Sequence, residues 1–304
     1  MKLFKIIFLF IFLAGHFVLA EDQILNNPTP EKRSIIFAPL LDAIIPGYTQ
    51  LVDGETGKAS IFFGTSLAGM LVNSAARRNI KDFDESDSKR YHFYRDNQRV
   101  EGISNALVKQ ASLVSLYDGF LTRVKDYQSN SQYLFLPKDQ NLESIHKAPF
   151  NFQYMKRATT WVPFLLAVGL GVSGFNESPS PHRFDIRPID GLASTYQSYS
   201  AGVSEEAFFR GWMQPILYEN TQSYWLSNTA QAVIFGYAHG PEPYFQLAFG
   251  FYTGWLVPEN GWDMGESIFI HTWWDLILMT ASYARTRSLT KDFNIQLPLI
   301  NARF

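Results

Sequence analysis

Residues 191–218 read GLASTYQSYSAGVSEEAFFRGWMQPILY, an apolar stretch of helical length that contains two adjacent glutamates and one arginine. Ionisable side chains are costly inside apolar helices, so they are candidates for function wherever they occur there. The surrounding block is poor in cations, because Arg210 is the only Lys or Arg between Arg187 and Arg285. These features predict helices packed together in lipid, with their charged groups turned inward.

Three further apolar stretches follow in the same block, at about residues 224–238, 244–257 and 267–283. Several of them are nearer fifteen residues than the twenty or so that cross a bilayer. That length favours short or tilted helices around a wet cavity. The predicted fold class is therefore all-α, a polytopic transmembrane helical bundle with polar loops.

The composition agrees with apolar spans separated by polar segments. Hydrophobic residues make up 46% of the 304 residues, and charged residues make up 18%, below the roughly 25% of soluble domains. The net charge of −2 provides no basic field, so no nucleic-acid partner is expected. Cysteine is absent, which excludes disulfides, thiolate metal ligands and a cysteine nucleophile.

The chain divides into four expected segments. Residues 1–20 carry an early lysine pair, an apolar run and a small residue at the end, as a secretory signal peptide does. An uncleaved anchor is the alternative, because the apolar run is only slightly short of a span. We expect an N-terminal membrane hairpin, further helices and polar loops in residues 21–190. Residues 191–286 form the core with the ionisable groups, and residues 287–304 form a polar C-terminal tail.

The upstream segment contains its own signs of membrane residence. Apolar residues 35–51 and 59–76 are expected to pair as a hairpin. The sequence P-G-Y-T-Q at residues 46–50, followed by G-K at 57–58, resembles the P-G-x-x-Q…K-G hairpins of small bacterial membrane proteins. This short similarity supports location in a membrane and implies no chemistry.

Two more candidate spans differ in the number of charged residues that interrupt them. Residues 159–175 are rich in Gly, Val and Leu, contain no charged residue, and are expected to span the membrane. Residues 107–124 are interrupted by Lys109, Asp118 and Arg123, so a span competes with an amphipathic helix at the interface.

The glutamates in S-E-E-A-F-F-R-G differ in their expected surroundings. On a helix, Glu206 and Arg210 are four residues apart and share a face, so they are expected to form an ion pair. Glu205 lies about 100° round the helix and is freer to face a cavity and take protons. The alternative is a loop-to-helix junction, where two solvated glutamates would be stabilised by the helix N-terminus.

Histidines end or interrupt two of the other apolar stretches. His239 closes one of them just before Gly240, where a histidine can also be a helix-end residue stabilised by the dipole. His271 and Asp275 share one helical face, so the aspartate could orient the imidazole, or both could face a bound group. A polar pair that holds two helices together is the alternative.

Two histidines and nearby carboxylates can activate water directly or bind a divalent metal such as zinc. If a metal is present, Glu205, His239 and His271 are its expected ligands; no cofactor is certain. An H-E-x-x-H sequence is absent, which excludes a standard zincin helix.

Three motifs, in order, resemble the CPBP intramembrane proteases: E-E-x-x-x-R at residues 205–210, F-x-x-x-H at 235–239 and H-x-x-x-D at 271–275. This family includes the type II CAAX prenyl endopeptidases and the lysostaphin-resistance-like proteins. The resemblance covers about residues 191–283. It implies a catalytic site composed of Glu205, Glu206, Arg210, His239, His271 and Asp275.

The roles implied by the family follow the motifs. Glu205 and His239 would activate the attacking water, while Glu206 and Arg210 would support the site. The second histidine and the aspartate would hold the water or stabilise the oxyanion. Asp275 departs from the family, in which Asn is common at this position. Because a carboxylate can donate a hydrogen bond only when protonated, orienting the histidine or binding a metal suits Asp275 better.

The expected function is an intramembrane endopeptidase acting on membrane-associated or prenylated-type peptide or protein substrates. The expected location is an integral, multi-pass position in a lipid bilayer, of the bacterial inner-membrane type. One alternative is a non-catalytic membrane protein of the same fold that serves as an immunity, scaffold or partner-binding factor. Another is metal-dependent transport, since acids and histidines within helices also line ion paths.

Overall fold

The computed structural model describes residues 30–81, 91–127, 133–173, 186–240 and 243–288. Every regular element within these ranges is helical, which confirms the all-α fold class. The expected signal peptide lies outside them, as does the C-terminal tail from residue 289.

The helices of the N-terminal half are α2 (Pro30–Asp42), α3 (Tyr48–Val52), α4 (Thr56–Lys81), α5 (Tyr91–Tyr127), α6 (Leu142–Lys147), the 3-10 helices η2 (Ala148–Phe150) and η3 (Phe152–Lys156), and α7 (Ala158–Ser173). Those of the C-terminal half are α8 (Pro188–Glu206), η4 (Ala207–Met213), α9 (Gln214–Thr221), α10 (Tyr224–His239), α11 (Tyr244–Glu259) and α12 (Gly265–Ser288).

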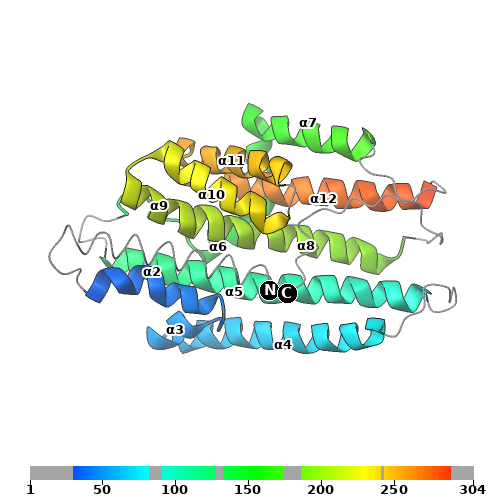
Figure 1. The fold of residues 1–304 in the computed structure, drawn as a ribbon, viewed down its shortest axis with the longest axis horizontal. Coiled ribbons are helices and arrows are strands. Elements are labelled where there is room, and N and C mark those ends of the chain that lie inside the picture. The colour runs from blue at the N-terminus through cyan, green and yellow to red at the C-terminus, as the bar shows by residue number, and fades with distance from the viewer. Residues whose placement is uncertain (1–29, 82–90, 128–132, 174–185, 241–242, 289–304) are drawn as a thin grey trace.

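The helices are stacked in layers around α5, which runs the length of the molecule (Figure 1). Helix α4 packs on one side of α5 and α8 on the other. Helix α12 packs against α8 and α7, and α10 pairs with α11. The largest cluster of buried apolar side chains joins α5 to α8 and η4, with Leu116, Phe120 and Trp212 fully covered.

Helix α5 is a core helix. It includes residues 107–124, for which a span competed with an interfacial helix, and its polar groups are paired inside the protein. Asp118 accepts a hydrogen bond from Lys58, at 3.2 Å, and the guanidinium of Arg123 contacts Asp53 at 2.7 Å. Interhelical pairing therefore explains how a charged sequence is accommodated in the middle of the bundle.

The P-G-Y-T-Q…G-K sequence binds the first helices to α5. The backbone N–H of Gly47 donates to Ser115 Oγ at 2.8 Å, and the Gln50 amide donates to the Ser115 carbonyl at 2.9 Å. Gly47 has φ +90°, and a Cβ there would lie 2.6 Å from the carbonyl oxygen of Ala59. Only glycine permits this approach, so the motif has a packing role within this fold.

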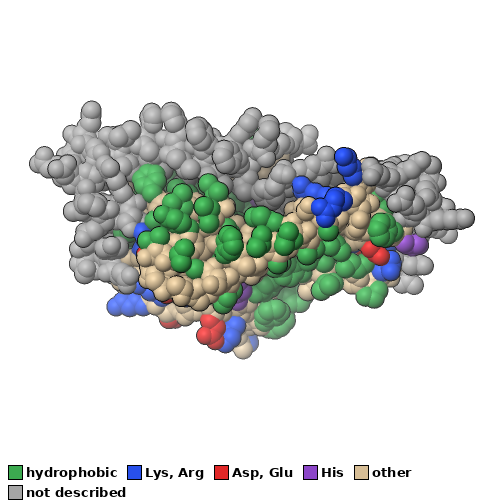
Figure 2. All heavy atoms as spheres, turned by 90° about the horizontal axis from the view of Figure 1, so that it is seen from below, with side chains coloured by type: hydrophobic (Ala, Val, Ile, Leu, Met, Phe, Trp, Pro, Cys, Tyr) green, Lys and Arg blue, Asp and Glu red, His purple; other side chains and the backbone are tan. Residues whose placement is uncertain are grey.

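Among the residues that the structure describes, one helix is long and apolar enough to cross a membrane, namely Thr56–Lys81, and Ala158–Val172 forms a shorter apolar helix. Only 22% of the most apolar part of Thr56–Lys81 is buried inside the protein. Its exposed side chains include Ile61, Phe63 and Leu71. Figure 2 views the molecule from below Figure 1, the side on which α4 lies, and shows hydrophobic side chains gathered on this face. Apolar surface of this extent suits contact with lipid.

Short helices lie in the described part of the polar stretch between α5 and α7, residues 133–157. It contains α6, η2 and η3, which pack beside the C-terminal helices. The indole N–H of Trp273 on α12 donates to the carbonyl of Pro149 at 2.9 Å. This stretch is therefore joined directly to the helix that carries His271.

Candidate active site

The two glutamates lie at the last turn of α8, where the chain continues into a π-helical segment, η4. Wider π turns inside α-helices are frequent at functional sites. Glu205 is 6% exposed, and Glu206 and Arg210 are fully buried. The alternative of two solvated glutamates at a helix start is therefore wrong, because both lie at a buried helix end and need partners within the protein.

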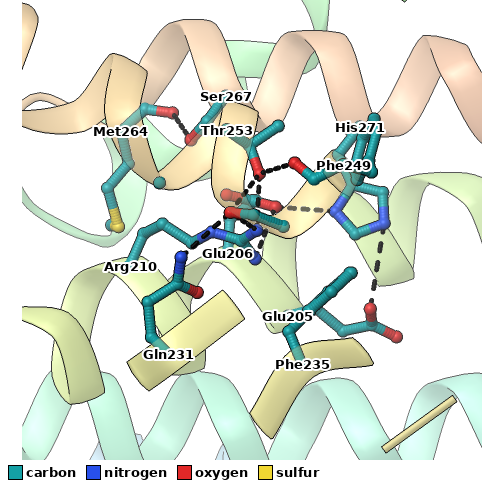
Figure 3. Close-up of polar contacts among 12 residues, drawn as sticks. Glu205, Glu206, Arg210, Gln231, Phe235, Phe249, Thr253, Met264, Ser267 and His271 are labelled. Atoms are coloured by element: carbon teal, nitrogen blue, oxygen red, sulfur yellow. Dashed lines mark hydrogen bonds and ion pairs between the residues drawn. The ribbon is translucent and has the colours of Figure 1, made fainter. Parts of the chain in front are cut away.

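Glu206 is held by two basic groups. Its Oε1 lies 3.1 Å from Arg210 Nη1, so the ion pair expected from the four-residue spacing is present. The same oxygen lies 2.7 Å from Nδ1 of His271, which reaches it from α12 (Figure 3). Because an ionised carboxylate only accepts hydrogen bonds, this contact requires a proton on Nδ1 of His271.

Arg210 is fixed from α11 and α10 as well. Its Nη2 donates to the carbonyl of Gly250 at 3.0 Å and to the hydroxyl of Thr253. The guanidinium carbon lies 4.6 Å from the centre of the Phe235 ring, which is a cation–π contact. Arg210 thus links three helices and compensates the charge of Glu206 where water has no access.

Glu205 points to the opposite side, toward the histidines. Its Oε2 lies 3.4 Å from Nε2 of His239 and 3.8 Å from Nε2 of His271. Neither this oxygen nor His271 Nε2 has a hydrogen-bond partner among the described residues. Three polar atoms from three helices therefore converge on one small region.

The tautomer of His239 follows from its own helix. Nδ1 contacts the carbonyl of Phe235, and a carbonyl can only accept, so Nδ1 carries the proton. In the neutral ring Nε2 is then an acceptor facing Glu205. A water molecule has two protons, so Glu205 Oε2 and one imidazole Nε2 can accept both of them, and the other imidazole can contact the water only as a protonated donor.

Asp275 lies close to His271 but does not orient it. Asp275 Oδ2 is 3.7 Å from His271 Nε2, beyond hydrogen-bond distance, and Oδ1 has no partner in the described chain. The orienting role that the four-residue spacing suggested for Asp275 is filled by Glu206, at 2.7 Å from the other ring nitrogen. The reason is that the ring points its Nδ1 across to α8.

One further residue, which the motifs do not include, lies at the centre of the site. Lys109 on α5 places its ammonium 2.7 Å from Glu205 Oε1, with its side chain 19% exposed. In the sequence Lys109 stands out only as an interruption of residues 107–124. A lone cation within an apolar stretch was the available signal, but sequence spacing cannot identify a partner on another helix.

The three expected metal ligands supply donor types that zinc accepts. However, no group of three or more His, Cys, Asp or Glu side chains in the described ranges is arranged so that it could hold a metal ion. The ammonium of Lys109 also occupies the second oxygen of Glu205. A nearby fixed cation opposes the binding of another, so this arrangement fits water better than a metal.

Residues 192–290 match the family model described as type II CAAX prenyl endopeptidase Rce1-like. No curated protein and no solved structure gives a significant match to the chain. The matched segment contains all six residues of the E-E-x-x-x-R, F-x-x-x-H and H-x-x-x-D motifs. This match, over about a third of the chain, confirms that these motifs resemble the type II CAAX prenyl endopeptidases of the CPBP intramembrane proteases.

Proposed function

We propose that this chain is an intramembrane endopeptidase that cleaves membrane-associated or prenylated-type substrates with a water activated by Glu205 and His239. The family is a protease family, which supports peptidase activity in general terms. The observation that carries the specific proposal is the convergence of Glu205 Oε2 with Nε2 of His239 and His271, at 3.4 and 3.8 Å.

The mechanism begins with a water between these atoms. Glu205 Oε2 accepts a proton from the water, whose oxygen attacks the carbonyl carbon of the peptide bond. His239 Nε2 accepts the second hydrogen bond of the water and directs its lone pair. The proton then passes to the amide nitrogen, the C–N bond breaks, and the products are a carboxylic acid and an amine.

His271 is proposed to hold the water in its doubly protonated form, in which Nε2–H donates to the water oxygen, rather than to take the first proton. Glu206 accepts the Nδ1–H of this ring and fixes its orientation, and Arg210 keeps Glu206 charged. Asp275 would donate to an oxyanion only in its protonated form. Glu206 and Arg210 thus support the site by fixing the orientation of the His271 ring, whose Nε2 faces Glu205.

The proposed setting is a multi-pass position in a lipid bilayer. Exposed apolar side chains on both α4 and α7 support it, since these helices lie on opposite outer sides of the bundle (Figure 1). A site enclosed by helices in lipid excludes bulk water, which strengthens the electrostatic interactions among its charged groups.

The test is proteolysis by the purified protein, with Glu205→Gln and His239→Ala as variants. Each should lower the rate by at least about 100-fold, the scale of general acid–base catalysis. The matched control is Glu143→Gln, because Glu143 is also a glutamate paired with a lysine, yet is exposed on α6. It should cleave as the wild type does.

Proteolysis that survives Glu205→Gln would rule out the mechanism. Full cellular function in that variant would favour the non-catalytic alternative. Comparing membrane proteomes with and without active enzyme should show substrates that accumulate uncut. Matched peptides with and without a prenyl group would then test the lipid requirement directly.

A further inference from the structure

Lys109 contacts the side of Glu205 that faces away from the histidines. Its ammonium lies 2.7 Å from Oε1, while Oε2 faces the imidazoles of His239 and His271. One oxygen of the Glu205 carboxylate therefore contacts Lys109, and the other faces the region where the water is expected. A charge-assisted bond of this kind restricts rotation of the carboxylate and favours its ionised form.

The register of α5 against α8 brings Lys109 to this position. Ala106 lies one turn before Lys109 on α5, and its carbonyl accepts a hydrogen bond from Ser200 on α8 at 2.8 Å. The residue after Lys109, Gln110, accepts a hydrogen bond from Tyr196 at 3.0 Å. With polar contacts on both sides, a shift of α5 by one turn would break both bonds as well as the ion pair.

Helix α5 lies outside the segment that matches the family model, so Lys109 is a contribution of the upstream region to the site. That region is anchored near Lys109 by buried polar contacts. Ser115 on α5 binds Gly47 and Gln50, which lie just before and within α3. The upstream helices therefore hold in place the helix that supplies a cation to Glu205.

A purely stabilising ion pair is a weaker explanation. Removing two charges from water costs much of what their attraction returns, so buried pairs seldom contribute net stability. The cost of burying the Lys109–Glu205 pair is better explained if Lys109 sets the charge and orientation of Glu205 for catalysis. We propose that Lys109 is a positioning residue, which keeps Glu205 ionised and directs its Oε2 to the water held by the histidines. This proposal deepens the proposed peptidase function and rests on it.

Several other charged or titratable groups interact with Glu205, and any effect of pH must be separated from theirs. They are Arg210 from η4, His239 from α10, and His271 and Asp275 from α12, beside the adjacent Glu206 in the chain. Among the described residues, Lys109 is the only lysine in an ion pair with Glu205. Its removal changes one fixed positive charge and leaves the histidines in place.

The proposal predicts a change in the pH profile. Without the ammonium, an ionised Glu205 is less favourable, so the acidic limb of the activity profile should move to higher pH by about 1–3 units in Lys109→Met. Activity at neutral pH should fall, and raising the pH should restore much of it. Lys109→Arg keeps the charge and should keep a profile close to that of the wild type.

The control is Lys58→Met, which removes another interhelical lysine–carboxylate pair, at 3.2 Å from Asp118. This variant reports the effect of losing such a pair away from the site. It should change thermal stability while leaving the acidic limb in place. An equal shift in both variants would overturn the proposal, as would a raised KM with an unmoved profile, which would indicate substrate binding by Lys109.

A second measurement does not depend on proteolysis. Infrared titration can follow the protonated carboxyl band of Glu205, identified as the band lost in Glu205→Gln. Its midpoint should rise in Lys109→Met and stay near the wild-type value in Lys109→Arg. If the wild type fails to cleave peptides but the midpoint moves, the proposed function fails and the role of Lys109 stands. An unmoved midpoint overturns the role of Lys109, whatever the activity.

Discussion

Replacing Arg210 with Met tests whether the supporting pair is as tightly coupled as its geometry indicates. The variant keeps most of the side-chain volume but removes the charge beside Glu206, 3.1 Å away. It also removes the donors to the Gly250 carbonyl and the Thr253 hydroxyl. Glu206 would remain fully buried, and among the described residues His271 would be its only basic partner.

The expected cost is large because a buried charge loses its compensation. Breaking a buried pair from one side typically costs about 3–5 kcal/mol, and we expect Arg210→Met to fall in that range. Adding Glu206→Gln removes the stranded charge and should recover about 2 kcal/mol or more. Activity should stay low in the double variant, because Gln cannot fix the His271 ring as a carboxylate does.

Equilibrium unfolding in mixed detergent micelles would measure these free energies, with proteolysis measured in parallel. Arg77→Met is the control, since Arg77 pairs with Glu101 at 2.8 Å but is 42% exposed. That variant should lose less than about 1 kcal/mol. A cost below about 1 kcal/mol for Arg210→Met, or a double variant no more stable than the single one, would refute the reasoning.

Two further predictions concern carboxylates in α8 and α12. Burial opposes the charge of Asp190, yet the Arg187 backbone N–H and the guanidinium groups of Arg99 and Arg95 outweigh it, so the pKa of Asp190 is lowered. Its stabilising effect is therefore present above the unfolded pKa of about 3.9 and lost as pH falls through the folded value. Asp190→Asn should cost about 3 kcal/mol at pH 7, and the difference from wild type should shrink below about pH 4 in thermal unfolding. Asp275→Asn removes a negative charge that repels Glu205, so the acidic limb of proteolysis should move to lower pH by about one unit, opposite to Lys109→Met.

Local spacing was sufficient for contacts within one helix. The four-residue separation of Glu206 and Arg210 predicted their ion pair, and the 100° rotation per residue predicted that Glu205 would face elsewhere. Both inferences depend only on helix geometry, which a sequence specifies directly. The positions of His239 and His271 near Glu205 needed the family resemblance, because spacing alone left other interpretations open.

Contacts between helices could not be obtained in this way. His271 and Asp275 are correctly spaced for a pair, but the ring turns to Glu206 on α8. Lys109 and Glu205 are separated by 96 positions, and only the parallel packing of α5 on α8 brings them together. The π-helical turn after Glu206 also has no simple sequence signal. Each depends on tertiary packing, which overrides local preference.

The charges of the site suggest why the upstream region matters to the domain. Three carboxylates, those of Glu205, Glu206 and Asp275, are buried within a few ångströms of the two histidines, and Arg210 compensates only one of them. An Asn at the last position, as in many family members, would require one cation fewer. With Asp there, an additional positive charge lowers the cost of keeping Glu205 ionised. Lys109 supplies that charge from α5, so the helices outside the family segment provide part of the electrostatic environment in which Glu205 would act as a base.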